Sequence, residues 1–134
     1  MTLSIRKQIV LEIALVVAIM TTATLIKLWR LGEHAFVFDE AIYASISKYF
    51  VTKGFDWQVE RELGSSHTPL QLFILGWSWL LGQRFFPWVS EEFVFRLPSV
   101  IISSLTIPLL YMITRRFGVL VSLTAVLFFA FHPY

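Results

Sequence analysis

Two adjacent carboxylates, Asp39 and Glu40, are the side chains of this sequence best placed to do chemistry. They open a stretch, Asp39 to Lys53, in which apolar residues recur at helical spacing, and Gly54 follows as a natural stop. A positioned carboxylate can take a proton from an attacking hydroxyl, which is worth roughly 10² to 10⁴ in rate. The alternative is capping, with Asp39 as the N-cap and Glu40 in the first turn, where free N–H groups and the helix dipole favour acids. The two roles are compatible, because a cap fixes a carboxylate and keeps it ionised.

Three cationic side chains, Lys53, Arg61 and His67, lie in or after the same stretch. Such groups, or a metal, could stabilise the negative charge of a departing phosphate. His67 also fits an ordinary turn before Pro69. Arg96 fits an interfacial arginine whose guanidinium reaches the lipid headgroups. The residues alone leave these alternatives open.

The elements that must position these groups are membrane helices. The chain is 57% hydrophobic and 16% aromatic, and its mean hydropathy is +0.71, which is outside the range of ordinary soluble domains. The net charge is only +2 and the basic residues are scattered, which argues against nucleic acid as a partner. There is no cysteine, so disulfides and thiolate metal sites are excluded.

We therefore expect an all-α integral membrane protein, a multi-pass transmembrane helical bundle with an amphipathic juxtamembrane helix in its first extramembrane loop. The sequence predicts membrane segments at 8–30, 69–86, 97–114 and 118–134, the last of them truncated by the chain end. Residues 31–68 form the predicted loop, with a surface helix at 39–53. Residues 90–96 are expected to be a short connection. Because the chain stops while still hydrophobic, we expect it to be the N-terminal fragment of a longer protein.

The charges do not fix how the chain is oriented in the membrane. If the N-terminus is inside and three segments cross before Arg115, the basic pairs at 6–7 and 115–116 fall on opposite sides. This is contrary to the cytoplasmic preference of Lys and Arg. Either that preference is overridden, or the segment at 69–86 does not fully cross. Glu12 lies inside the first predicted span, and we expect its carboxylate to reach the interface. It is also the one candidate for a transport pathway, so a transporter or channel has little support.

Four short motifs occur in a characteristic order beside these apolar runs. They are Phe38-Asp39-Glu40-Ala41-x-Tyr43, His67-Thr68-Pro69-Leu70, Phe95-Arg96-Leu97-Pro98-Ser99 and Arg115-Arg116-Phe117-Gly118. In this order they resemble the N-terminal part of the polyprenyl-phosphate-sugar-dependent glycosyltransferases of the GT-C superfamily. The most similar branch is the protein O-mannosyltransferase and aminoarabinose transferase group.

The resemblance implies a membrane enzyme that moves a sugar from a polyprenyl-phosphate carrier to a hydroxyl of a protein, lipid or glycan. Asp39 falls on the essential aspartate of the family, expected to be a general base or to orient the acceptor, and Glu40 falls on its neighbour. Both would lie in a loop on the extracytoplasmic side of the cell membrane. His67 and Arg96 match basic positions of the family. With Arg61 and Tyr43, they are the residues expected to bind the substrate or its phosphate.

The sequence also departs from the family pattern. Thr68 replaces the first proline of the usual pair, and Ser66 stands where some relatives have a glutamate. A divalent metal is therefore left open as a cofactor. A different class of protein also fits the sequence, a non-catalytic membrane subunit or scaffold that docks a partner through its acidic loop. From Gly32 to Thr68 that loop carries six acids against three bases.

Overall fold

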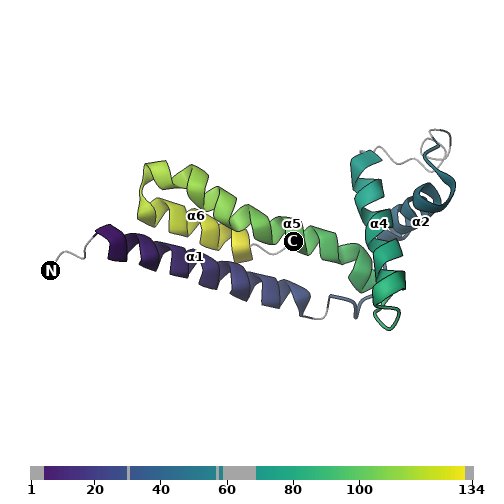
Figure 1. Cartoon of the computed structure of the whole chain (residues 1–134), viewed down its shortest axis with the longest axis horizontal. Helices are drawn as coiled ribbons and strands as arrows, with labels where there is room; N and C mark the ends of the chain where they lie inside the picture. The colour runs from purple at the N-terminus through teal and green to yellow at the C-terminus, as the bar shows by residue number, and fades with distance from the viewer. Residues whose placement is uncertain (1–4, 30, 57, 59–68, 132–134) are drawn as a thin grey trace. The chain divides into compact units, whose positions relative to one another are not determined.

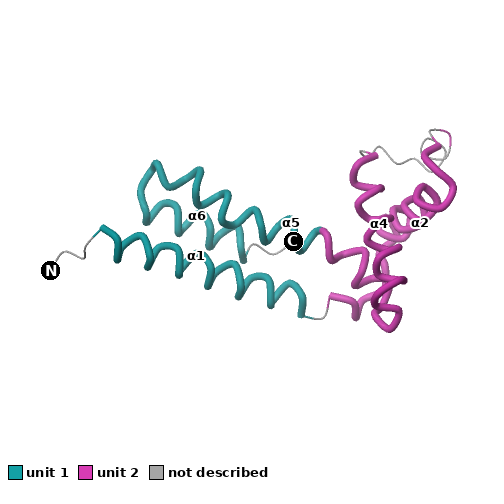
Figure 2. Tube along the Cα trace, in the orientation of Figure 1, with its two compact units in different colours: residues 1–29, 99–134 teal, residues 30–98 magenta. Residues whose placement is uncertain are grey.

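A computed structural model describes residues 5–29, 31–56, 58 and 69–131 of the chain. Every regular element within these ranges is helical, as predicted (Figure 1). The elements are α1 (Ile5–Leu28), α2 (Phe38–Lys53), α4 (Pro69–Phe85), α5 (Glu91–Thr114), the 3-10 turn η1 (Arg115–Phe117) and α6 (Val119–Phe131). The chain divides into two compact units (Figure 2). Unit 1 contains residues 1–29 and 99–134, and unit 2 contains residues 30–98.

Two helices of the described part are long and apolar enough to cross a membrane. They are α1 and the continuous segment Glu91–Phe117, which joins α5 to η1. The described part of α6 is apolar but shorter. Helix α4 has 17 residues, fewer than the roughly 20 that a crossing usually needs. The predicted crossing at 69–86 is therefore not among the two long apolar helices, and it stays a prediction.

Helices α1 and α5 run antiparallel within unit 1. At one end Arg115 donates hydrogen bonds from Nε and Nη2 to the Glu12 carboxylate, at 2.8 and 3.0 Å. The Tyr111 hydroxyl donates another at 2.6 Å. At the other end Thr24 Oγ1 donates to Ser104 Oγ at 2.8 Å. Glu12 is therefore paired across the two helices, and the position of its carboxylate at the interface stays a prediction.

This arrangement also groups the basic residues of unit 1. Arg6 and Lys7 lie in the first turn of α1, within two turns of Glu12. Arg115 and Arg116 follow α5 directly, and Arg115 pairs with Glu12. The two basic pairs thus lie at the same end of unit 1, not at opposite ends as three full crossings would require.

The interior of unit 1 is built from small and branched apolar side chains. Its buried cluster consists of Val16, Ala23, Ile107, Val126 and Ala130. Small residues at helix contacts let backbones approach closely, as is usual between helices in a membrane. Large apolar side chains cover the outside, and Met112 and Phe128 are 71% and 76% exposed. This outer surface suits contact with lipid.

Helix α5 begins six residues earlier than the predicted helix at 97–114, so the predicted connection at 90–96 is wrong. Ser90 Oγ accepts a hydrogen bond from the Phe93 N–H at 3.3 Å, and Glu91 and Glu92 occupy the first turn. A serine cap followed by acids favours a helix start, and it outweighs the later proline as a boundary signal.

Pro98 consequently lies inside α5, where it cannot donate a backbone hydrogen bond to the Val94 carbonyl. Ser78 of α4 replaces the missing donor, because its hydroxyl donates to the Val94 carbonyl oxygen at 2.7 Å. The proline is therefore accommodated by a side chain from a neighbouring helix.

Unit 2 is organised by the packing of α2 on α4. Ile46 and Phe50 of α2 and Leu72 of α4 are fully or almost fully buried and form its apolar core. Gly76 permits a close approach, because a Cβ atom at that position would lie 2.5 Å from the Ser47 carbonyl oxygen. The core thus fixes α2, which carries the two acids.

Candidate functional site

The candidate site is the N-terminus of α2 in unit 2. The helix begins at Phe38, and the N-cap is Val37, whose backbone is extended with φ −70° and ψ 156°. Asp39 and Glu40 are the second and third residues of the helix. Glu40 Oε2 accepts a hydrogen bond from the Val37 N–H at 3.1 Å. The predicted N-cap role of Asp39 is therefore wrong: Glu40 satisfies the N–H of the cap residue from within the helix, as in half of a capping box.

Arg96 of α5 binds the other side of Glu40. Its Nε donates to Glu40 Oε1 at 3.1 Å, and its Nη2 donates to Oε2 at 2.7 Å. The remaining donor capacity of the guanidinium is directed at the carbonyl oxygens of Leu31, His34 and Ala35, at 2.9, 3.0 and 3.3 Å. We call this set of five hydrogen bonds the Arg96 clasp. It ties the segment before α2 to the start of α5.

The Arg96 clasp determines the electrostatics of Glu40. The hydrogen bonds from Arg96 lower the pKa of the Glu40 carboxyl below its usual value of 4.5. Partial burial raises the pKa of this carboxyl, and the hydrogen bond from the Val37 N–H lowers it further. Glu40 is thus held as an ionised group, and both of its oxygens are occupied. In this structure Glu40 and Arg96 hold the loop together, and their roles as catalytic acid and phosphate ligand stay predictions.

Asp39 differs from its neighbour. Its side chain is exposed, and among the described residues it makes no hydrogen bond or ion pair. The exposed side chains of Val37 and Phe38 precede it, and Phe38 is 78% exposed. A carboxylate in the first turn interacts favourably with the helix dipole. The backbone of Asp39 is therefore fixed by the helix, and its carboxylate is exposed to an incoming molecule.

A second ion pair joins α2 to the first turn of α5. Lys48 Nζ donates to Glu91 Oε2 at 2.6 Å, and Trp79 Nε1 of α4 donates to Glu91 Oε1 at 3.1 Å. The Lys48 ammonium also lies 5.4 Å from the centroid of the Trp79 ring. Sequence reasoning missed this cluster, because its members are up to 43 residues apart and no local pattern connects them.

The other predicted site residues divide into two groups. Tyr43 lies one turn after Asp39 and packs, half-buried, against the apolar core of unit 2. Arg61 and His67 lie outside the described residues. In the part of the chain that the structure describes, no three acidic or histidine side chains gather into a group that could hold a metal ion. The divalent metal that the sequence leaves open therefore has no cluster of ligands within these ranges.

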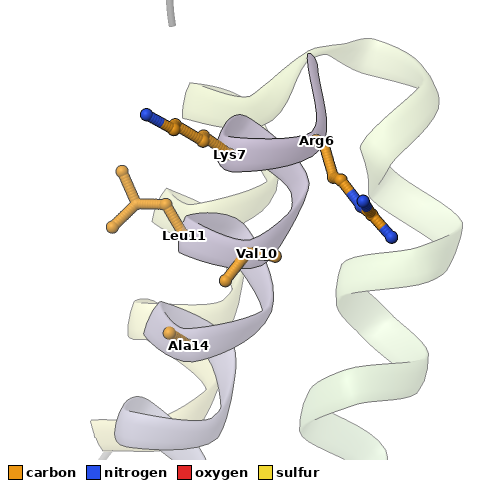
Figure 3. Close-up of a pocket in the computed structure, with 5 residues that line it drawn as sticks. All are labelled: Arg6, Lys7, Val10, Leu11 and Ala14. Carbon is orange, nitrogen blue, oxygen red and sulfur yellow. The ribbon is translucent and has the colours of Figure 1, made fainter. Parts of the chain in front are cut away.

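A shallow apolar hollow lies elsewhere, at the N-terminal end of α1 in unit 1 (Figure 3). It is lined by Arg6, Lys7, Val10, Leu11 and Ala14. The side chains of Arg6 and Lys7 point to opposite sides of the helix and do not converge on a shared ligand. Neither Asp39 nor Glu40 lines this hollow, so it does not contribute to the candidate site.

No protein-family model, no curated protein and no solved structure matches this chain.

Proposed function

We propose that the chain acts in a membrane glycosyltransferase that moves a sugar from a polyprenyl-phosphate carrier to a hydroxyl of a protein, lipid or glycan. The observation that carries the proposal is the contrast between the two adjacent acids. Glu40 is fully engaged in the Arg96 clasp, and Asp39 is presented to solvent without a partner among the described residues. An acid held in this way suits a general base, because its backbone is fixed while its carboxylate stays accessible.

The reaction assigns one role to Asp39. Its carboxylate takes the proton of the acceptor hydroxyl as the oxygen forms a bond to the anomeric carbon of the sugar. The bond between that carbon and the phosphate oxygen breaks, and the polyprenyl phosphate leaves as an anion. A phosphate leaving group needs stabilisation by positive charge and not by an acid. Arg61 and His67 keep that predicted role, and Glu40 and Arg96 act as positioning residues.

We place the chain in the cell membrane as a multi-pass protein, with Asp39 on the extracytoplasmic side. The grouping of both basic pairs at one end of unit 1 supports this orientation, because Lys and Arg are enriched in cytoplasmic loops. The chain leaves unit 1 after residue 29 and rejoins it at residue 99 at the opposite end, where Thr24 bonds to Ser104. Residues 30–98 then lie on the extracytoplasmic side, where they can meet an acceptor arriving from water.

The test is sugar transfer in membranes that contain the full-length protein, with a panel of radiolabelled polyprenyl-phosphate sugars as donors. We expect Asp39→Asn to abolish transfer while membrane insertion is unchanged. Asp56→Asn is the matched control, because it makes the same chemical change elsewhere in unit 2 and should leave transfer intact. Transfer by Asp39→Asn at the rate of the control would refute the proposal. It would favour the alternative of a non-catalytic subunit that docks a partner through its acidic loop.

A further inference from the structure

The contacts within unit 1 limit how the intervening chain can meet a membrane. Helices α1 and α5 are antiparallel, because Glu12 near the start of α1 pairs with Arg115 just after α5, and Thr24 near the end of α1 bonds to Ser104 in the middle of α5. If both helices cross the bilayer, they cross it in opposite directions. Residues 30–98 must then leave and re-enter the membrane on the same side. They can contain no crossing or two crossings, but not one.

Two crossings would require α2 to span the membrane together with α4. Helix α2 has 16 residues and includes Asp39, Glu40, Lys48 and Lys53. A spanning helix needs about 20 mainly apolar residues, and charges within it are costly. Helix α2 fails on both grounds. Residues 30–98 therefore contain no crossing, and α4 cannot be the membrane span predicted at 69–86.

Helix α4 nevertheless presents a long apolar face. One side of the helix packs on α2 through Leu72 and Gly76, which are buried. On another side, large apolar residues recur every three or four positions and stay exposed, and the turn after the helix continues them. We call this set the α4 stripe: Leu70, Ile74, Trp77, Leu81, Phe85, Phe86 and Trp88.

We infer that α4 lies in the extracytoplasmic interface of the bilayer, with the α4 stripe against lipid acyl chains. Lipid is the fitting occupant because both ends of unit 2 continue directly into membrane-crossing helices, so this unit is held at the bilayer surface. Trp77 and Trp88 suit the headgroup zone, and Arg84 in the last turn can reach lipid phosphate. An amphipathic helix in this position lies in the plane of the membrane. The extracytoplasmic side rests on the orientation proposed above, and α4 would lie in the interface whether or not the chain transfers sugar.

The first test compares two positions that flank α4. The chain has no cysteine, so Lys53→Cys and Pro87→Cys each introduce a single thiol outside the α4 stripe. A membrane-impermeant maleimide applied to intact cells should label both variants from outside, whereas Phe117→Cys should be labelled only after permeabilisation. Labelling of only one flank from outside would mean that α4 crosses, and it would overturn the inference. Thr52→Cys and Ser90→Cys repeat the comparison if either first variant fails to insert.

The second test asks what covers the α4 stripe. A spin label is attached to Leu81→Cys or to the matched control Gln83→Cys, which lies outside the stripe. Each protein is reconstituted alone in phosphatidylcholine and phosphatidylglycerol vesicles. At Leu81→Cys we expect frequent collision with oxygen and shielding from a water-soluble nickel chelate, and the reverse at Gln83→Cys. Nickel access at both positions would overturn the inference. Protection of Leu81→Cys from both reagents would also overturn it, because protein would then cover the stripe.

Discussion

Removal of the Arg96 clasp should open the segment before α2 without unfolding the rest of unit 2. Arg96 makes five hydrogen bonds, of which the two to Glu40 and the one to the Leu31 carbonyl are partly buried. The two bonds to His34 and Ala35 are exposed, so water can replace them. At a net 0.5 to 1.5 kcal/mol per bond, the three partly buried bonds contribute roughly 1.5 to 4.5 kcal/mol. With about 3 kcal/mol as the central value, the equilibrium constant for opening of the segment before α2 should be on the order of 100-fold larger in Arg96→Ala.

Hydrogen exchange at single amides can measure this opening. The Val37 N–H is bonded to Glu40, and the Ala41 N–H to the Val37 carbonyl, so both amides report directly on the start of α2. We expect their exchange to accelerate in Arg96→Ala, while the Gly54 N–H at the far end of α2 stays protected. Arg96→Lys should fall between the two, because an ammonium keeps the charge but cannot serve two carboxylate oxygens and the carbonyls together.

The matched control is Arg84→Ala, which removes an exposed arginine that makes no hydrogen bond or ion pair with the described residues. If the Val37 and Ala41 amides of Arg96→Ala exchange no faster than those of the control, the clasp contributes nothing to the order of the site. The assignment of Arg96 as a positioning residue would then be refuted.

Three further outcomes follow from the structure. The lowered pKa of Glu40 means that this carboxylate stabilises unit 2 above pH 4.5 and that the stabilisation is lost as pH falls through the folded-state pKa. Glu40→Gln should therefore make the loss in acid smaller in urea titrations followed by circular dichroism, and the part due to the lowered pKa of Glu91 should stay. Gly76→Ala should destabilise unit 2 by about 1 to 3 kcal/mol in the same assay, because its Cβ would meet a backbone carbonyl of α2. Gly82→Ala should cost less, because the three nearest atoms to its Cβ all belong to the Val94 side chain and none to the backbone. Glu12→Leu should lower the melting temperature in detergent, because it leaves the Arg115 guanidinium without its ion-pair partner. The double variant Glu12→Leu with Arg115→Leu should recover part of the loss, because it leaves no unpaired charge.

The local features of this fold could be predicted from the sequence. The helix expected at 39–53 is observed as Phe38–Lys53, and Gly54 ends it with a positive φ of 96°. The first long apolar run predicted at 8–30 is the helix Ile5–Leu28. The helical spacing of apolar residues and the stop residue after them are enough to predict these helices, because both signals lie within a few turns of the chain.

Two kinds of feature could not be found in this way. The predicted start of α5 is too late because Pro98 gives a strong boundary signal, although the cap at Ser90 and the acids after it are visible in the sequence. The pairing of Glu40 with Arg96 joins residues 56 positions apart, and only tertiary packing brings them together. A single sequence carries no record of such a pairing. The different contacts of the two adjacent acids could therefore be seen only in the structure.

The hydrogen bond from Ser78 to the Val94 carbonyl has a mechanical consequence. A helix bends most easily where a proline removes one hydrogen bond of its backbone, and Pro98 removes that bond near the start of α5. Because the replacement donor is Ser78 of α4, this part of α5 is supported only while α4 stays docked on it. Ser78→Ala would leave the Val94 carbonyl without this donor, and α5 would bend more easily at that point even with α4 in place.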